Sequence, residues 1–375
     1  MPSSKSIGLG LIGCGSFGAF CLRSARDLPL ARPVAVADAR PDAAKALGAE
    51  FDVPAVSPKE LIERDDVHLV HLATPPSSHH ELTTAAIRAG KHVLCEKPLA
   101  VSTEEADAIL EAAEAANAIC PVNFVLRHNA VTDAAKAVLD SGALGKPLSA
   151  RLTNCATDSF LPPEHWFWDK SLSGGIFIEH GVHFFDLYRY WLGEGRVVSA
   201  RAETRPGTNQ EDRVTCVVRH ERGALVSHYH GFDQIAPMDR AEHRIVCEMG
   251  DVRVFGWIPL TLVVDAAVDE EGLQRLESLL DGSEIETIEP YATPVREILG
   301  RGQVRRPSQR VRLTFRPEPD KQAVYARSVS ELLADQVAYL LDADHARVIS
   351  EQNGREAVAL AERAATLAAR ADAAP

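Results

Sequence analysis

Two groups of residues in this sequence have the types and spacing of a site that moves protons. The first is the triplet Glu-Lys-Pro at 96–98, which directly follows the apolar run HVLC at 92–95. The second is the segment 174–186, GGIFIEHGVHFFD, where a helix from near Glu179 would place His183 on the same stripe, four residues on. A lysine, a carboxylate and an imidazole can together bind a substrate hydroxyl and remove its proton. The two groups therefore predict acid-base chemistry.

The elements that must position the lysine begin with a glycine-rich turn. Ile7–Ile12 reads as a strand, GCGSFG follows at 13–18, and an amphipathic helix comes next. A second strand, Val34–Ala37, ends in Asp38. Strand, glycine turn, helix and acid together form the dinucleotide fingerprint, in which the helix N-terminus binds the pyrophosphate and the acid binds the adenosine ribose. The residues expected to contact the cofactor here are Gly13, Gly15, Ser16, Phe17, Gly18, Asp38 and Arg40.

Asp38 also bears on the choice of cofactor. A carboxylate accepts hydrogen bonds from the ribose hydroxyls of NAD but repels the 2′-phosphate of NADP. Arg40, two residues on, offers a cation to that same phosphate. We expect NAD, with NADP the less favoured cofactor.

The βαβ alternation continues through about the first 120 residues. A strand over Val67–Ala73 runs into TPPSSH at 74–79, and the strand at 92–95 carries the Glu-Lys-Pro triplet at its end. Ser102 begins a capping box for the next helix, and Ile119–Val125 reads as the last strand of this region. Open α/β sheets bind their ligands at the carboxyl ends of the strands, so Lys97 lies where chemistry is expected.

The glycine turn, Asp38, TPPSSH, Glu-Lys-Pro and GGIFIEHGVHFFD together resemble the Gfo/Idh/MocA oxidoreductases, the glucose-fructose oxidoreductase and inositol dehydrogenase family, from about Ile7 to Leu192. The resemblance implies an α/β protein: an NAD-binding Rossmann domain, 1–123, and an α+β substrate and oligomerisation domain, 124–375, with a large, mostly antiparallel open sheet. It implies a cis Lys97–Pro98 peptide. Further cofactor contacts are expected from Thr74, Pro75, His79, Glu96, Lys97 and Asn123.

The same resemblance implies the catalytic roles. Lys97 would face the nicotinamide and the substrate hydroxyl, and His183 would transfer the proton with it or instead of it. This sequence has Glu179 where the family usually has aspartate, so we expect Glu179 to orient its partners or bind substrate. Asp186 is expected to be structural, and His180 to have no catalytic role. The alternatives are a surface lysine paired with Glu96 and an ordinary hydrogen-bonded His183.

Candidate substrate contacts lie nearby. Arg127 could bind a carboxylate or phosphate, or form a surface ion pair. Trp166 and Trp168 could pack on the apolar face of a sugar, or belong to the core. His183 would also touch the substrate. A metal site drawn from Glu179, His183, His228 and His230 has no compact zinc motif behind it, so no metal is expected.

The second half of the chain predicts short alternating strands. The predicted strands are Leu148–Thr153, Val197–Glu203, Arg213–His220, Ala224–His230 and Arg244–Glu248. Helices are expected around Ser328–Leu341 and Arg355–Arg370. The arginine-rich stretch 296–316 reads as a solvated loop, or else as an interface arm or anion site. In the family, the open sheet face commonly pairs subunits, so a homo-oligomer, dimer or tetramer, is expected.

Composition limits the partners. The 375 residues carry a net charge of −13, which disfavours nucleic acid and anionic membranes, and no apolar run reaches the roughly 18 residues of a membrane span. The start, MPSSKSIG, has no signal-peptide core, and the seven cysteines form no CxxC pair, so we expect reduced thiols in the cytoplasm.

These observations predict an NAD-dependent dehydrogenase or reductase acting on a secondary alcohol or ketone of a sugar, cyclitol or related small molecule. Two alternatives stay open: an NAD-dependent glycosidase of the same fold, and a ligand-sensing binding protein without catalysis.

Overall fold

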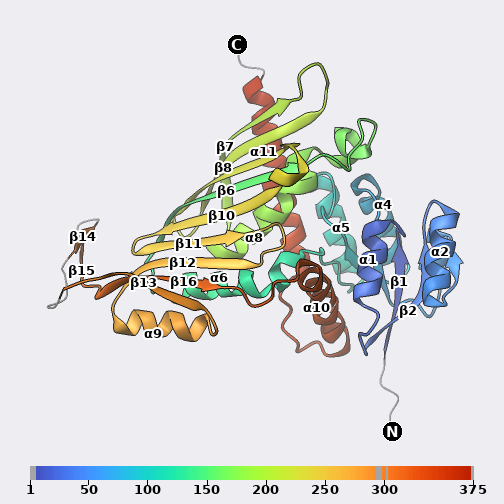
Figure 1. Cartoon of the computed structure of the whole chain (residues 1–375). Coiled ribbons are helices and arrows are strands. Elements are labelled where there is room, and N and C mark those ends of the chain that lie inside the picture. The colour runs from blue at the N-terminus through green and yellow to red at the C-terminus, as the bar shows by residue number, and fades with distance from the viewer. Residues whose placement is uncertain (1–5, 293–297, 301–302, 373–375) are drawn as a thin grey trace, which may run out of the picture. The chain divides into compact units, whose positions relative to one another are not determined.

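The computed structural model describes residues 6–292, 298–300 and 303–372, and its described residues fall into two compact units (Figure 1). The first unit holds the chain up to His128 together with Pro163–Asp186 and Tyr325–Arg363. The second holds Asn129–Pro162, Leu187–Val324 and the described residues from Ala364 onward. Both predicted catalytic groups, 96–98 and 174–186, therefore lie in the first unit.

The first unit is built on a five-stranded sheet in which every paired strand runs parallel. The strand order is β3-β2-β1-β4-β5, so the order reverses between β1 and β4, where open α/β sheets bind ligands. The strands are β1 Ile7–Ile12, β2 Ala31–Ala37, β3 Ala55–Val56, β4 Leu69–Leu72 and β5 His92–Cys95. The predicted Rossmann sheet is confirmed.

Helices connect these strands, including the two predicted after the glycine turn and after Ser102. They are α1 Ser16–Ser24, α2 Pro41–Phe51, α3 Pro58–Glu63, α4 His79–Arg88 and α5 Thr103–Ala115. Ser102 caps α5 by accepting a hydrogen bond from the Glu105 backbone N–H at 3.2 Å. Burial of apolar side chains on both faces of the sheet follows from this wrapping.

The strand predicted at Ile119–Val125 is confirmed only in part. Three backbone hydrogen bonds pair the segment with β5, from the N–H of Val93 to Ile119, of Cys95 to Pro121 and of Asn123 to Cys95, but these described residues form no regular strand. Among the residues that the structure describes there, one isolated bridge joins Val122 to Cys95, and a short 3-10 helix, Val125–His128, follows. Pro121 has no backbone N–H, so a continuous ladder cannot form across this segment.

The C-terminal helices complete the first unit. α11, Glu351–Asp372, carries Arg355, whose guanidinium forms two hydrogen bonds, at 2.7 and 3.2 Å, with Asp107 on α5. On the same helix, a Cβ on Gly354 would lie 2.4 Å from Val122 Cγ2. Most of α10, Lys321–Leu341, also belongs to this unit. The predicted C-terminal helices are confirmed, with earlier starts than expected.

The second unit is built on a nine-stranded sheet in the order β13-β16-β12-β11-β10-β6-β9-β8-β7, whose long strands are visible in Figure 1. Neighbouring strands are antiparallel except β6 and β9, so the predicted, mostly antiparallel sheet is confirmed. The strands are β6 Pro147–Thr157, β7 Gly195–Thr204, β8 Glu211–His220, β9 Leu225–Gln234, β10 Arg240–Cys247, β11 Gly250–Phe255, β12 Thr261–Val268, β13 Glu284–Pro290 and β16 Gln309–Phe315.

The remaining elements are short or connect these strands. They are α6 Ala130–Asp140, α7 Lys170–Ser173, α8 Val182–Leu192, α9 Glu270–Leu279, β14 Ile298–Gly300 and β15 Gln303–Arg305. The boundary between the two units falls within α8, after Asp186. None of the described helices has both the length and the apolar character needed to cross a membrane.

The two faces of the nine-stranded sheet differ. One face buries four imidazoles, those of His220, His228, His230 and His243, near the rings of Tyr188 and Trp191. The other face carries ion pairs such as Arg244–Asp251, at 2.6 Å, and Arg312–Asp265, at 3.0 Å. This alternation is the period-2 pattern of a sheet with one covered face.

The arginine-rich stretch 296–316 is not the expected loop where the structure describes it, because Ile298–Gly300 pairs with Gln303–Arg305 and Gln309–Phe315 forms β16. Arg310 and Arg312 lie on β16, whose intervening Val311 and Leu313 are fully buried. The inward Val and Leu stabilise a strand, while the arginines project to the other face, where Arg312 pairs with Asp265. Arg296 and Arg301 lie outside the described residues.

Candidate active site

The glycine turn fits a bound pyrophosphate. Gly13 has φ +103°, and a Cβ there would lie 2.2 Å from the Ala73 carbonyl oxygen, while a Cβ on Gly18 would lie 2.0 Å from the Gly13 oxygen. Gly15 differs, because the nearest atom to its Cβ position is Arg40 Nη2 at 4.0 Å. Gly15 is also the N-cap of α1 and provides no side-chain cap. Gly13 and Gly18 are therefore required by the fold. Gly15 instead leaves open the approach of a ligand to the helix N-terminus, where Ser16 and Phe17 begin the first turn.

Asp38 is held firmly at the end of β2. One carboxylate oxygen accepts a hydrogen bond from the Cys14 backbone N–H at 2.7 Å, and the other accepts from the Arg40 backbone N–H, also at 2.7 Å. The Arg40 side chain is exposed, with Nε 3.4 Å from the same carboxylate. The carboxylate is thus fixed for a ribose hydroxyl, and an exposed cation lies beside it. Their relative influence on the choice between NAD and NADP stays a prediction.

His79 joins two segments that were predicted to contact the cofactor. Its ring is fully buried, with Nδ1 2.6 Å from the Pro98 carbonyl oxygen and Nε2 2.8 Å from the Thr74 carbonyl oxygen. Burial lowers the pKa of His79, although the two carbonyl contacts act in the opposite direction. These contacts tie the turn at Thr74 and Pro75 to the Glu-Lys-Pro triplet. Direct cofactor binding by Thr74, Pro75 and His79 stays a prediction.

Lys97 and Glu179, 82 residues apart in sequence, are in contact. The Lys97 ammonium donates to the Glu179 backbone oxygen at 2.8 Å and to its carboxylate at 2.5 Å. The Lys97–Pro98 peptide is cis, as predicted. Lys97 keeps 19% of its side chain exposed, so it can still meet a ligand. The alternative in which Lys97 is a surface lysine paired with Glu96 is wrong.

Glu179 lies in an irregular turn. Residues Phe177–Gly181 form a π-helix, and the regular helix α8 begins only at Val182. Gly174 and Gly175, both with positive φ, precede this turn, and the Glu179 N–H donates to the Gly175 oxygen at 2.8 Å. π-Helical turns are rare and concentrate at functional sites. The predicted helix is therefore present, with a wide turn at the residue that contacts Lys97.

The two imidazoles of this segment are held neutral. Burial lowers the pKa of His183 well below its usual value, and the positive charge of Lys97 lowers it further. Burial and the same Lys97 charge lower the pKa of His180 to about 3. His183 also packs edge-on against Phe124, with ring centroids 6.3 Å apart. A neutral imidazole can accept a proton, but burial and the Lys97 charge make both of these rings weaker bases than a histidine in water. His180, which we had expected to be catalytically silent, shares this environment.

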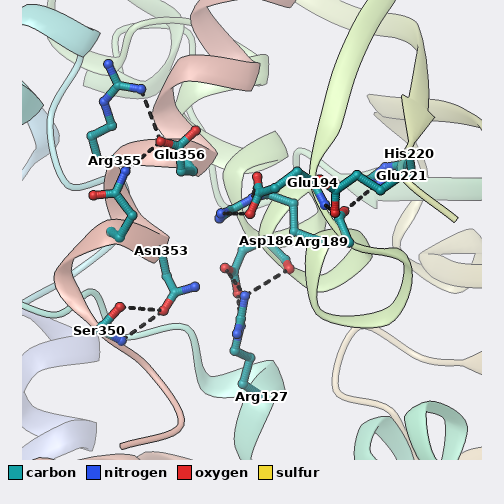
Figure 2. A network of polar contacts seen from close by, with 12 residues as sticks. Arg127, Asp186, Arg189, Glu194, His220, Glu221, Ser350, Asn353, Arg355 and Glu356 are labelled. Carbon is teal, nitrogen blue, oxygen red and sulfur yellow. Dashed lines mark hydrogen bonds and ion pairs between the residues drawn. The ribbon is translucent and has the colours of Figure 1, made fainter. Parts of the chain in front are cut away.

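Arg127 and Asp186 form a buried pair (Figure 2). Nε and Nη2 of Arg127 each lie 2.7 Å from an oxygen of the Asp186 carboxylate. This two-pronged contact fits the structural role expected for Asp186. Substrate binding by Arg127 stays a prediction.

The tryptophans lie in a short 3-10 helix, Trp166–Trp168. Trp168 is buried and packs edge-on against Phe167, with ring centroids 4.9 Å apart. Trp166 is half-buried and contacts the His165 ring at 5.1 Å. Trp168 therefore has the surroundings of a core residue, and substrate contact by either ring stays a prediction.

Glu96 turns away from Lys97 into a buried polar cluster. Its Oε1 lies 3.1 Å from His71 Nε2, 2.5 Å from Asn123 Nδ2 and 3.9 Å from Cys21 Sγ. Cofactor contact by Glu96 or Asn123 stays a prediction. Sequence reasoning missed His71 and Cys21. The signal available was a histidine inside β4, LVHL, where a parallel strand buried on both faces is otherwise apolar.

Comparisons with known proteins match both parts of the chain to one family. Residues 7–124 match the model described as the GFO_IDH_MocA oxidoreductase family, NAD-binding Rossmann fold. Residues 132–253 match the model of the GFO/IDH/MocA C-terminal domain.

Curated relatives include several dehydrogenases. Levoglucosan dehydrogenase of Pseudarthrobacter phenanthrenivorans is 34% identical over 215 residues, which are 53% of this chain and 55% of that protein. Myo-inositol 2-dehydrogenase of Thermotoga maritima is 30% identical over 226 residues, 58% of this chain and 66% of that protein. The chain thus aligns with a little over half to about two thirds of the length of these relatives.

Solved structures show the same fold along the whole chain. Levoglucosan dehydrogenase in complex with NADH and levoglucosan superposes with a TM-score of 0.77 at 24% identity, covering 97% of this chain and 98% of that one. With both domain models of this family matched in order, the chain belongs to the GFO/IDH/MocA oxidoreductase family.

Proposed function

We propose that this protein is an NAD-dependent dehydrogenase or reductase that acts on a secondary alcohol or ketone of a sugar, a cyclitol or a related small molecule. The observation that carries the proposal is the contact between Lys97 and Glu179, beside a neutral His183, in the unit that contains the dinucleotide fingerprint.

The residues divide the chemistry between them. Bound nicotinamide supplies or accepts the hydride. Lys97, oriented by two acceptors on Glu179, donates a hydrogen bond to the substrate oxygen as charge develops on it. His183, neutral because it is buried and close to the lysine charge, takes the hydroxyl proton on a ring nitrogen. In the reducing direction the imidazolium returns that proton.

The substrate class comes from the relatives. They are named as dehydrogenases or reductases of levoglucosan, inositols and 1,5-anhydro-D-fructose, all polyhydroxylated rings or their ketones. We assign the cofactor to residues 1–123 and substrate recognition to residues within 124–375, with Arg127, Trp166, Trp168 and His183 as candidate contacts.

The test is a panel of cyclitols, anhydrosugars, aldoses and sugar acids with NAD⁺, followed by NADH absorbance. Sustained NADH formation on one member, lost in Lys97→Met and His183→Asn, supports the proposal. Glycoside hydrolysis without net NADH would assign the transient-oxidation glycosidase instead. Cofactor binding with no turnover on any member would favour a ligand-sensing protein.

We further infer that the protein forms homo-oligomers through the exposed face of the nine-stranded sheet. That face combines a row of ion pairs with exposed apolar residues, including Val198 and Leu225. Light scattering coupled to gel filtration tests the oligomeric state. The cysteines, all buried free thiols, support a reducing compartment such as the cytoplasm.

A further inference from the structure

The charges around the candidate site do not cancel. Lys97 pairs with Glu179 at 2.5 Å, which joins one cation to one anion. Glu96, the residue before Lys97, contributes a second carboxylate. Among the described residues, its ion-pair partner is His71, which carries a charge only when protonated, and its other donors, Asn123 and Cys21, are neutral. At pH 8.5, above the ordinary titration range of histidine side chains, the group has one cation, Lys97, and two carboxylates, Glu96 and Glu179.

Glu96 is buried, so water screens its charge weakly. It is 6% exposed and lies among the sheet, α1 and α10. Its field reaches several neighbours: after burial itself, Glu96 is the next cause that raises the pKa values of Cys21 and Tyr325. A charge in such surroundings acts over several ångströms more strongly than one in water.

The topology places this charge at the nicotinamide end of the cofactor. Asp38, which would bind the adenosine ribose, follows β2 on one side of β1. Glu96 follows β5, beyond β4 on the other side. Because a dinucleotide lies across the carboxyl ends of these strands from one half to the other, its nicotinamide half falls on the side of β4 and β5.

We propose that Glu96 is the counter-charge of the oxidised nicotinamide ring, so that this buried carboxylate makes the site bind NAD⁺ more tightly relative to NADH. The inference rests on the proposed use of NAD. The two cofactor forms differ by one positive charge on the ring, and only the oxidised form brings the group of Lys97, Glu179 and Glu96 to neutrality. His71 and Asn123 act as positioning residues that hold the carboxylate in place.

The test compares cofactor affinities rather than turnover. Dissociation constants of NAD⁺ and NADH are measured by calorimetry at pH 8.5, where histidine side chains are ordinarily neutral. The quantity of interest is the Kd of NADH divided by the Kd of NAD⁺ for each variant. This ratio does not depend on the folded fraction of a preparation, because both ligands sample the same molecules.

Glu96→Gln keeps the shape of the side chain and removes its charge. A nearby charge shifts an ionisation equilibrium by about tenfold or more, so we expect Glu96→Gln to lower the ratio of the two dissociation constants by about the same factor. Glu96→Asp keeps the charge and should retain most of the ratio. Lys97→Met removes the cation and should raise the ratio. Asp107→Asn, which removes a carboxylate from a surface ion pair of the same unit, is the control and should leave the ratio unchanged.

The outcomes separate the two proposals. If the wild-type protein binds neither NAD⁺ nor NADH, the proposed function fails. If it binds both and Glu96→Gln leaves the ratio unchanged, the role of Glu96 is overturned while the function stands. Should Glu96→Gln fail to fold by circular dichroism, Lys97→Met decides, and an unchanged ratio in that variant overturns the counter-charge.

Discussion

Loss of the contact between Lys97 and Glu179 should lower both the stability of the protein and its turnover. The two side chains are 19% and 11% exposed, so the pair lies between exposed pairs, worth about 0.2–1 kcal/mol, and buried pairs, whose breakage costs about 3–5 kcal/mol. Lys97→Met leaves the Glu179 carboxylate and backbone oxygen without this donor. We expect it to lower the free energy of unfolding by about 1–3 kcal/mol.

A double-mutant cycle isolates the pair. Glu179→Gln leaves the ammonium with a neutral side-chain acceptor, and the double variant Lys97→Met/Glu179→Gln leaves no unpaired charge, so it should be less destabilised than the sum of the single variants. Turnover should fall about 10²–10³-fold in Lys97→Met, since the hydrogen bond to the charge that develops on the substrate oxygen is lost, and should not recover in the double variant. Glu179→Asp, which restores the usual family residue, should be mild.

Urea unfolding followed by circular dichroism measures the stability, and NADH absorbance on a confirmed substrate measures turnover. Lys136→Met is the matched control, because Lys136 pairs with Asp140 at a more exposed position on α6 and should cost less than about 1 kcal/mol. If Lys97→Met keeps wild-type stability, near-full turnover and the same pH dependence, Lys97 is not the catalytic lysine.

Three further predictions concern the cofactor and the buried histidines. Gly15→Ala should fold normally yet lose NAD affinity in a fluorescence titration, whereas Gly13→Ala should destabilise the fold itself, since its Cβ would meet a backbone oxygen at 2.2 Å; equal losses of stability would contradict this. Asp38→Ser should bring the dissociation constants of NADH and NADPH closer together. If the wild-type protein binds NADPH more tightly than NADH, Arg40 rather than Asp38 determines the choice of cofactor. Burial lowers the pKa of His243 to about 3, so the unfolded chain takes up this proton first as the pH falls, and stability is lost between about pH 6.5 and 3. His243→Leu should reduce the pH slope of the unfolding free energy by about one proton in that range, and an unchanged slope would refute it.

Most of the first unit could be predicted from the sequence because the residues that determine its structure act on near neighbours in the chain. A glycine that cannot bear a side chain, an acid at a strand end and a capping serine each constrain a few neighbouring residues, and Gly13, Asp38 and Ser102 lie as those constraints require. The contact between Lys97 and Glu179 is of another kind, joining residues 82 apart. From the sequence, only the resemblance to a known family predicted that these two residues belong to one site.

Other features depended on tertiary context. The direction of the Glu96 side chain is decided by His71, Asn123 and Cys21, which come from three separate segments. No periodicity in the sequence distinguishes a glutamate that faces a ligand from one that faces such a cluster. The strand with Arg310 and Arg312 was missed because long charged side chains outweigh the alternating Val and Leu when composition alone is considered.

The discontinuity of the first unit has a consequence for synthesis. Its parallel sheet is complete once residue 95 has been made, yet α11, which packs on α5 and against Val122, begins only at Glu351. At about 5–20 residues per second, the surface of α5 and Val122 that α11 covers stays exposed for on the order of tens of seconds. The emerging chain therefore offers apolar surface to chaperones throughout that interval, and a protein truncated before α11 should aggregate rather than yield a free cofactor-binding domain.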